Sequence, residues 1–192
     1  GELARLGWQH RGWRPVVLEC WGRAGITFGS RVLDVGAGPG YATVDLAELV
    51  GPTGEVFAIE RSARFLEFAK NACAVRGLSH VRFRQADLME ESLGRLDFDA
   101  TWCRWVASFV SSPAKLIKPL PGALRPGGLA IFHEYLDHRT WRLPPRRPVV
   151  DPFVHHVLES RRAIGARPAA TPISSTHFPC PPSPSAPCLS PP

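Results

Sequence analysis

Cysteine is sparse in this chain of 192 residues, and its scattered positions exclude the close pairs that form metal sites: Cys20, Cys73, Cys103, Cys180 and Cys188. Free thiols of this kind suit a reducing cytoplasm, so we expect a cytoplasmic protein with no bound metal. No stretch approaches the roughly 18 apolar residues of a membrane helix. The first residues also have no basic-then-apolar signal region, so we expect no membrane partner.

Most of the chain carries almost no net charge, because the excess of positive charge is concentrated in one segment. The formal net charge is +6, but residues 139–167 hold seven arginines against two acids, and residues 1–138 are almost neutral. A near-neutral body does not provide a surface that follows a phosphate backbone. We therefore predict no nucleic-acid partner.

A single stretch, RVLDVGAGPGYAT at residues 31–43, organises the rest of the chain. Its apolar start, RVLDV, predicts a buried strand of a parallel sheet. The three glycines that follow allow a tight turn with bare backbone against a ligand. Residues 41–50 then resume at helical spacing, and the start of such a helix presents free N–H groups. The pattern predicts a nucleotide-type site in a single α/β domain.

The glycine spacing distinguishes between nucleotide classes. The dinucleotide fingerprint is G-x-G-x-x-G, whereas here Gly36, Gly38 and Gly40 alternate and Tyr41 occupies the position of the third glycine. The D-V-G-x-G-x-G form resembles the first motif of the class I S-adenosylmethionine-dependent methyltransferases. This resemblance implies a Rossmann-like, doubly wound, mostly parallel sheet with strand order 3-2-1-4-5.

The same resemblance implies S-adenosylmethionine as the cofactor and assigns residues to its parts. Glu60 ends the next predicted strand 24 residues after Gly36, close to the offset at which such folds place an acid on a ribose. A solvated strand-end glutamate is the alternative. Ala86-Asp87-Leu88 resembles the family's adenine motif, and Asp87 also suits an N-cap. The cofactor-binding residues predicted in this way are Asp34, Gly36, Ala37, Gly38, Gly40, Glu60, Arg61, Ala86, Asp87, Leu88, Cys103 and Arg104.

The first 30 residues are predicted to form a helical lid. Trp13, Val17 and Trp21 recur at helical spacing, and Pro15 stands where a helix could begin. One interpretation is an amphipathic helix that packs on the sheet edge. The other is a lid over the ligand, in which Gln9, His10 or Trp13 contacts it.

Further elements are predicted in chain order. Strands are expected at residues 55–60, 80–86, 96–103 and 129–135, with a helix at 62–77 between the first two. A helix at 111–124 should be distorted by Pro119 and Pro121. The L-R-P-G-G turn at 124–128 is another mark of the family.

The acceptor is predicted from the residues after the fourth strand. The run WCRWV is bulkier than the acidic or Asn-Pro-Pro-Tyr forms of members that methylate amines and nucleobases. This favours a small-molecule acceptor, with Trp102 and Trp105 as pocket wall or core. Methyl transfer depends mostly on orientation, so no catalytic residue is identified. Candidate substrate contacts are Trp13, Trp105, His133 and Glu134, and candidate bases are His133, Glu134, His155 and His156.

The resemblance weakens towards the C-terminus, where the family has two further strands. We divide the chain into the lid (1–30), a cofactor-binding core (31–138), a basic linker with one helix at 151–165 (139–166), and a disordered tail (167–192). The tail has nine prolines in 26 residues and no apolar period. We expect the last two strands to be absent, through truncation or a shifted reading frame.

Two rival functions remain at this point. A nicotinamide oxidoreductase would share the strand–glycine–helix pattern, except at Tyr41. The other rival is an inactive, truncated fragment of a methyltransferase. The acceptor's identity, the methylated atom and the oligomeric state are left open by these patterns.

Overall fold

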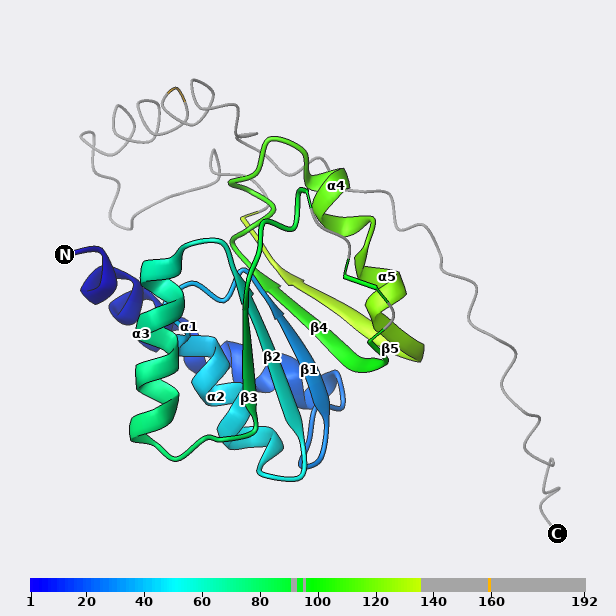
Figure 1. Cartoon of the computed structure of the whole chain (residues 1–192), viewed down its shortest axis with the longest axis horizontal. Coiled ribbons are helices and arrows are strands. Elements are labelled where there is room, and N and C mark those ends of the chain that lie inside the picture. The colour runs from blue at the N-terminus through cyan, green and yellow to red at the C-terminus, as the bar shows by residue number, and fades with distance from the viewer. Residues whose placement is uncertain (91–92, 95, 136–158, 160–192) are drawn as a thin grey trace, which may run out of the picture.

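Five parallel strands form one sheet in the order β3-β2-β1-β4-β5 (Figure 1). The computed structural model describes residues 1–90, 93–94, 96–135 and 159. The strands are β1 (Arg31–Val35), β2 (Glu55–Glu60), β3 (Val81–Gln85), β4 (Phe98–Arg104) and β5 (Leu124–His133). The predicted order is confirmed. Because β1 lies between β2 and β4, the chain reverses its direction of growth at β1, where such folds bind ligands.

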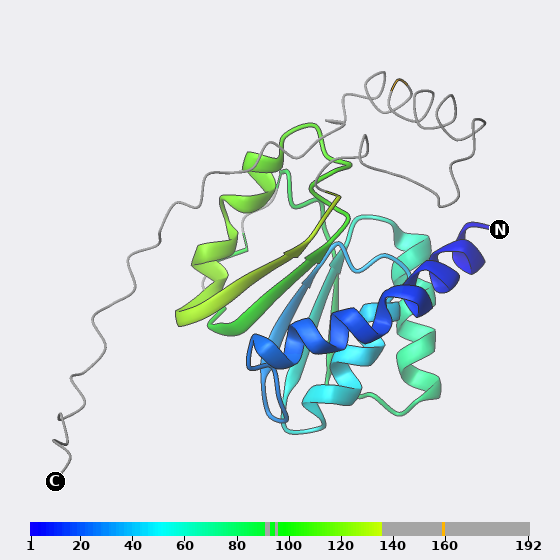
Figure 2. The same cartoon turned by 180° about the vertical axis from the view of Figure 1, so that it is seen from behind.

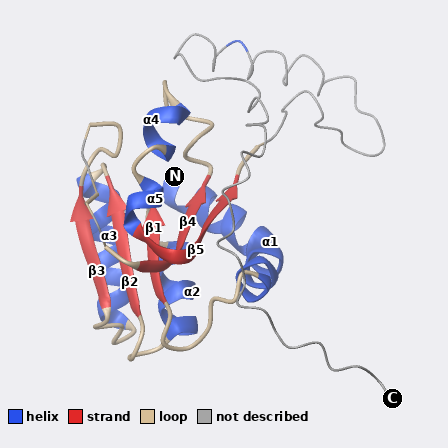
Figure 3. Ribbon diagram, turned by 90° about the vertical axis from the view of Figure 1, so that its right-hand side faces the viewer, coloured by secondary structure: helices blue, strands red, loops and turns tan. Residues whose placement is uncertain are grey.

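Helices cover both faces of the sheet (Figures 2 and 3). One face packs against α1 (Glu2–Arg23), α2 (Tyr41–Val50) and α3 (Ala63–Val75), and the other against α4 (Pro113–Ile117) and α5 (Leu120–Ala123). Side chains of β1 alternate between the two faces: Val32 joins the first core, whereas Leu33 and Val35 join the second. Burial on both faces explains the continuous apolar pattern of this strand.

Helix α1 begins earlier than the sequence predicted. The prediction that Pro15 marks a helix start was wrong, because Pro15 lies inside a helix that begins at Glu2. An interior proline costs about 3 kcal/mol through its lost hydrogen bond and a backbone clash. Tertiary packing offsets this cost: Val17 and Trp21 are buried, and Trp21 meets Trp102 of β4 edge-to-face at 5.2 Å.

Most other elements match their predictions within two residues. The Ser62 hydroxyl caps α3 by accepting a bond from the Phe65 N–H, as its position predicted. The distortion expected at the prolines is also confirmed, since α4 and α5 are separate short helices. The R-P-G-G segment differs from prediction. It lies within β5, where the pairing register with β4 shifts between Phe98 and Ala100.

The predictions for residues 136–192 lie outside the described residues, apart from Glu159. They include the basic linker, the helix at 151–165, His155, His156 and the tail. Across the described part of the chain, no helix has the length and apolar character to cross a membrane.

Candidate functional site

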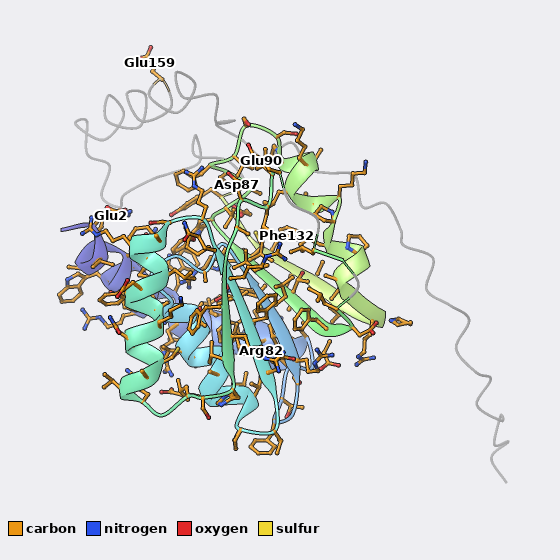
Figure 4. All side chains as sticks on the ribbon, in the orientation of Figure 1. Glu2, Arg82, Asp87, Glu90, Phe132 and Glu159 are labelled. Carbon is orange, nitrogen blue, oxygen red and sulfur yellow. The ribbon has the colours of Figure 1, made fainter. Side chains whose placement is uncertain are left out.

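A cavity of about 610 Å³ opens at the C-terminal ends of β1, β2 and β4. This volume falls in the usual range for small-molecule sites. Figure 4 shows Glu2 of α1 and Asp87, which follows β3, at this end of the sheet. Predicted residues in the lining are Gln9, Asp34, Gly36, Ala37, Gly38, Glu60, Arg61, Asp87, Leu88, Trp102, Arg104 and Trp105. Those outside it are His10, Trp13, Gly40, Ala86, Cys103, His133 and Glu134.

The three glycines of the loop after β1 have different roles. All have positive φ, at 69°, 57° and 80° for Gly36, Gly38 and Gly40. A Cβ on Gly36 would lie 2.4 Å from Val106, and one on Gly40 would lie 2.5 Å from Ala69, so both serve internal packing. A Cβ on Gly38 would meet no atom within 4 Å. Gly38 is therefore the position where bare backbone faces the cavity.

Glu60 holds this loop from the end of β2. One carboxylate oxygen accepts a hydrogen bond from the Gly38 N–H at 2.9 Å, and the other accepts from the Ser62 N–H at 2.8 Å. A carboxylate has about four lone-pair sites, so two remain for a ligand. The loop is also fixed at its start, because the Gly36 and Ala37 N–H groups both donate to the Ile59 carbonyl.

Asp87 lies where the chain leaves β3. Its carboxylate accepts a bond from the Met89 N–H at 2.9 Å, which stabilises the turn over residues 88–90. No helix follows it directly among the described residues, so the predicted helix N-cap was wrong. Asp87 and Leu88 also line the cavity, whereas Ala86 is buried beside them. The turn contact and a ligand-binding role for Asp87 are therefore compatible.

Asp34 is buried at the end of β1 and faces the start of α2. Its carboxylate accepts a hydrogen bond from the Thr43 hydroxyl at 2.6 Å. Burial raises the pKa of Asp34 to about 6, although the Thr43 bond and the charge of Arg104 oppose this rise. A buried acid that also lines a cavity is a common feature of binding sites.

Arg104 at the end of β4 belongs to a buried polar chain. It donates from Nη2 to His10 Nδ1 at 3.0 Å, and His10 Nε2 lies 3.1 Å from Asp45 of α2. Because a guanidinium can only donate, Nδ1 must accept, which assigns the ring proton to Nε2. Arg14 also bonds Asp45, at 2.8 Å. Burial alone would raise the pKa of Asp45, but the His10 and Arg14 bonds outweigh it and lower this pKa.

Aromatic rings form the side of the cavity next to β4 and β5. Trp105 has a positive φ of 57°, which is unusual for a bulky residue, and its ring stacks on Tyr135 at 5.5 Å. Trp13 and His133, which do not line the cavity, lie beside Trp105, at 6.5 and 5.5 Å between ring centres. Burial and the charge of Arg104 lower the pKa of His133.

Glu134 supports the loop after β4. Its oxygens accept hydrogen bonds from the N–H groups of Val106 and Ala107, both at 2.8 Å, and from the Ser108 hydroxyl at 2.9 Å. Burial raises the pKa of Glu134 against these bonds. Cys103 lies beside it, and burial raises the pKa of this thiol far above its usual value. The thiol is therefore protonated near neutral pH and is a poor nucleophile.

Several residues that line the cavity were not predicted to contact a ligand: Arg5, Tyr41, Phe65, Met89, Phe109, Val110 and Tyr135. The position of Tyr135 in the sequence could have indicated it, because Tyr135 comes just after the end of β5, as Glu60 and Arg104 lie at the ends of β2 and β4. Its hydroxyl also accepts a bond from Gln9 of α1 at 2.6 Å. No group of three metal-ligating side chains forms a metal site within the described ranges.

A family model described as a methyltransferase domain matches residues 26–164. The chain belongs to this methyltransferase family. Over 127 residues it is 31% identical to the ubiquinone/menaquinone biosynthesis C-methyltransferase UbiE of Pseudomonas aeruginosa, with 66% of this chain and 48% of that enzyme covered. It is 32% identical over 126 residues to the demethylmenaquinone methyltransferase of Staphylococcus aureus, with 66% and 50% covered.

A solved structure shares the fold of this methyltransferase domain. The SAM-dependent methyltransferase from Aquifex aeolicus superposes with a TM-score of 0.59 at 20% identity, covering 77% of each chain. The chain spans about half the length of the curated relatives it matches.

Proposed function

We propose that this methyltransferase domain binds S-adenosylmethionine and transfers its methyl group to a small-molecule acceptor. The observation that carries the proposal is the pairing of Glu60 with Gly38. Glu60 accepts a hydrogen bond from the Gly38 N–H and keeps lone pairs that can accept bonds from a ligand. Gly38 has no atom within 4 Å of the position of a Cβ, and both residues line the cavity at the C-terminal ends of neighbouring strands. Family membership supports this function over a nicotinamide oxidoreductase.

The residues that line the cavity suit successive parts of the cofactor. Glu60 would accept hydrogen bonds from the ribose hydroxyls, and Asp87 from the adenine amino group, because carboxylate oxygens only accept. Gly38 would lie under the methionine part, with Asp34 near its ammonium group. The cofactor supplies an electrophilic methyl group on a sulfonium. The protein then contributes mainly orientation, since an in-line displacement needs its two reactants held in line.

The acceptor would enter beside the aromatic wall. Trp105, Tyr135 and Phe109 line the cavity and offer flat apolar surface, which suits a planar small molecule. One curated relative is named for ubiquinone/menaquinone biosynthesis and the other as a demethylmenaquinone methyltransferase, and both names are consistent with such an acceptor. We further propose that the domain works in the cytoplasm without nucleic-acid or membrane partners.

Calorimetry with S-adenosylhomocysteine tests the cofactor site. We expect Glu60→Ala and Gly38→Ala each to weaken binding at least tenfold, because the first removes the ribose acceptor and the second adds a methyl group against the ligand. Glu55→Ala is the matched control, since Glu55 begins the same strand and pairs with Arg31. Gly77→Ala controls for backbone strain, because Gly77 also has positive φ (68°) and open Cβ space.

The controls should bind like the wild type. Unchanged affinity in both site variants would overturn the cofactor site. Product detection with a panel of planar acceptors and labelled cofactor then tests methyl transfer itself.

A further inference from the structure

We propose that Arg104 binds the α-carboxylate of the cofactor's amino-acid part, beside the ammonium group that the proposed function places near Asp34. This inference rests on the proposed function. Arg104 and Asp34 both line the cavity and come from adjacent strands, at the ends of β4 and β1. Together they would offer one positive and one negative side chain to a zwitterion.

The guanidinium of Arg104 has donors that the protein leaves unused. Its Nη2 donates to His10, but its Nη1 is buried and has no hydrogen-bond partner among the described residues. Burial lowers the pKa of Arg104, although an arginine stays charged near neutral pH. A buried charged donor without an acceptor is unfavourable, so a carboxylate delivered to this corner of the cavity would compensate it.

The direction of the bound cofactor follows from the sheet order. Glu60 and Asp87 follow β2 and β3, so the nucleoside would lie on that side of β1. The amino-acid part must then extend over β1 towards β4, where Arg104 stands. An acceptor would approach from Trp105 and Tyr135, the stacked pair on the β5 side.

The buried chain behind Arg104 fixes the guanidinium in position. His10 accepts from Arg104 and donates to Asp45, and Asp45 is held in turn by Arg14. His10 is thus a positioning residue that couples α1 to the cavity. A side chain held in advance loses less entropy when it binds its ligand.

Three ligands test this inference by calorimetry: S-adenosylhomocysteine, its decarboxylated amine, and 5′-methylthioadenosine, which lacks the whole amino-acid part. In the wild type we expect the decarboxylated amine to bind at least tenfold more weakly than S-adenosylhomocysteine. In Arg104→Gln, S-adenosylhomocysteine should lose about tenfold to a hundredfold in affinity. The affinities for the other two ligands should stay within about twofold of wild type. This comparison isolates the contact between the guanidinium and the carboxylate.

Arg76→Gln is the matched control, because Arg76 pairs with Glu48 at the surface and does not line the cavity. It should leave all three affinities unchanged. Thermal unfolding verifies that each variant is folded, and Arg104→Lys carries the test if Arg104→Gln does not fold. Lysine keeps the positive charge but lacks the planar guanidinium that binds a carboxylate through two hydrogen bonds. Arg104→Lys should therefore lose less affinity for S-adenosylhomocysteine than Arg104→Gln, and the loss should still be confined to that ligand.

Other outcomes separate this inference from the proposed function. A wild type that binds none of the ligands would overturn both. If all three ligands bind but Arg104→Gln changes none of their affinities, or weakens all three equally, the carboxylate contact is wrong and the cofactor site stands. The contact is also wrong if only the KM of the acceptor rises, because Arg104 would then bind the acceptor.

Discussion

Individual residues at the end of β1 show how burial alters chemistry. Asp34 is buried and accepts one hydrogen bond from Thr43, and its pKa is about 6 instead of the usual 3.8. The same residue type behaves differently at Asp99, near the opposite end of β4. There, burial raises the pKa, but bonds from the Arg31 N–H and the Arg125 side chain outweigh it and lower the value.

Asp34 therefore gives a prediction about stability and pH. The folded state holds the Asp34 proton more tightly than the unfolded state, so this group's contribution to stability falls as pH rises from about 4 to about 6. Asp34→Asn removes the ionisation and keeps an acceptor for Thr43. Relative to wild type, its free energy of unfolding should rise by about 2 to 2.5 kcal/mol between pH 4 and pH 7.5, at about 1.4 kcal/mol per pKa unit, because part of the change occurs below pH 4. Denaturant unfolding at both pH values measures the change.

The control for Asp34→Asn is Asp99→Asn, for which the expected change in stability with pH has the opposite sign. Its wild-type carboxylate stabilises the fold above the unfolded pKa, and this contribution is lost as pH falls through the lower folded pKa. The asparagine variant should therefore lose stability relative to wild type as pH rises. A difference between wild type and Asp34→Asn that is independent of pH would contradict the buried-acid interpretation.

At the scale of an element, the two halves of helix α1 lie in different surroundings. Its C-terminal half is the anchor, since Val17 and Trp21 are buried against the sheet. Its N-terminal half contributes Glu2, Arg5, Leu6 and Gln9 to the cavity lining. The packing interpretation drawn from the sequence is confirmed for the C-terminal half. The lid remains a prediction, which the position of the N-terminal half beside the cavity supports.

Two tryptophans of α1 separate these roles. Trp21 is fully buried, whereas Trp13 is 42% exposed and lies edge-to-face against the rings of Trp105 and His133. Trp21→Ala should lower the free energy of unfolding by about 3 to 5 kcal/mol, because it leaves a cavity in the core. Trp13→Ala should cost under about 1.5 kcal/mol. Denaturant unfolding compares them, and equal losses would contradict the division of α1.

At the scale of the whole molecule, the order of the strands determines where a ligand binds. Parallel strands bring the ends of β1, β2 and β4 to one edge, and the reversal at β1 separates the following loops and leaves a crevice. A ligand bound in this cavity would contact residues from the ends of several strands. It should therefore stabilise the entire domain by mass action.

Thermal unfolding gives the corresponding prediction. S-adenosylhomocysteine at 100 times its Kd should add about 2.7 kcal/mol of stability, a rise in Tm of roughly 5 to 10 °C for a domain of this size. NADH at the same concentration should leave Tm unchanged. A rise with NADH alone would instead favour the oxidoreductase.

Much of the fold was predictable because its signals are local. The apolar run of β1, the alternating glycines and the Ser62 cap lie within a few residues of the structure they specify. Position alone also indicated Glu60, since a strand-end acid points to the edge where ligands bind. The start of α1 was not predictable, because contacts with the sheet compensate for Pro15 and these contacts are distant in sequence.

The sequence by itself determined the strand order, through the glycine motif and its family resemblance, and the residue types at the strand ends. Only the tertiary structure decided how the glycines divide their roles, with Gly38 open to the cavity and Gly40 packed against Ala69. It also placed His10 between Arg104 and Asp45, which are 94 and 35 residues away along the chain. The physical reason is that burial and hydrogen-bond partners depend on which segments the fold brings together.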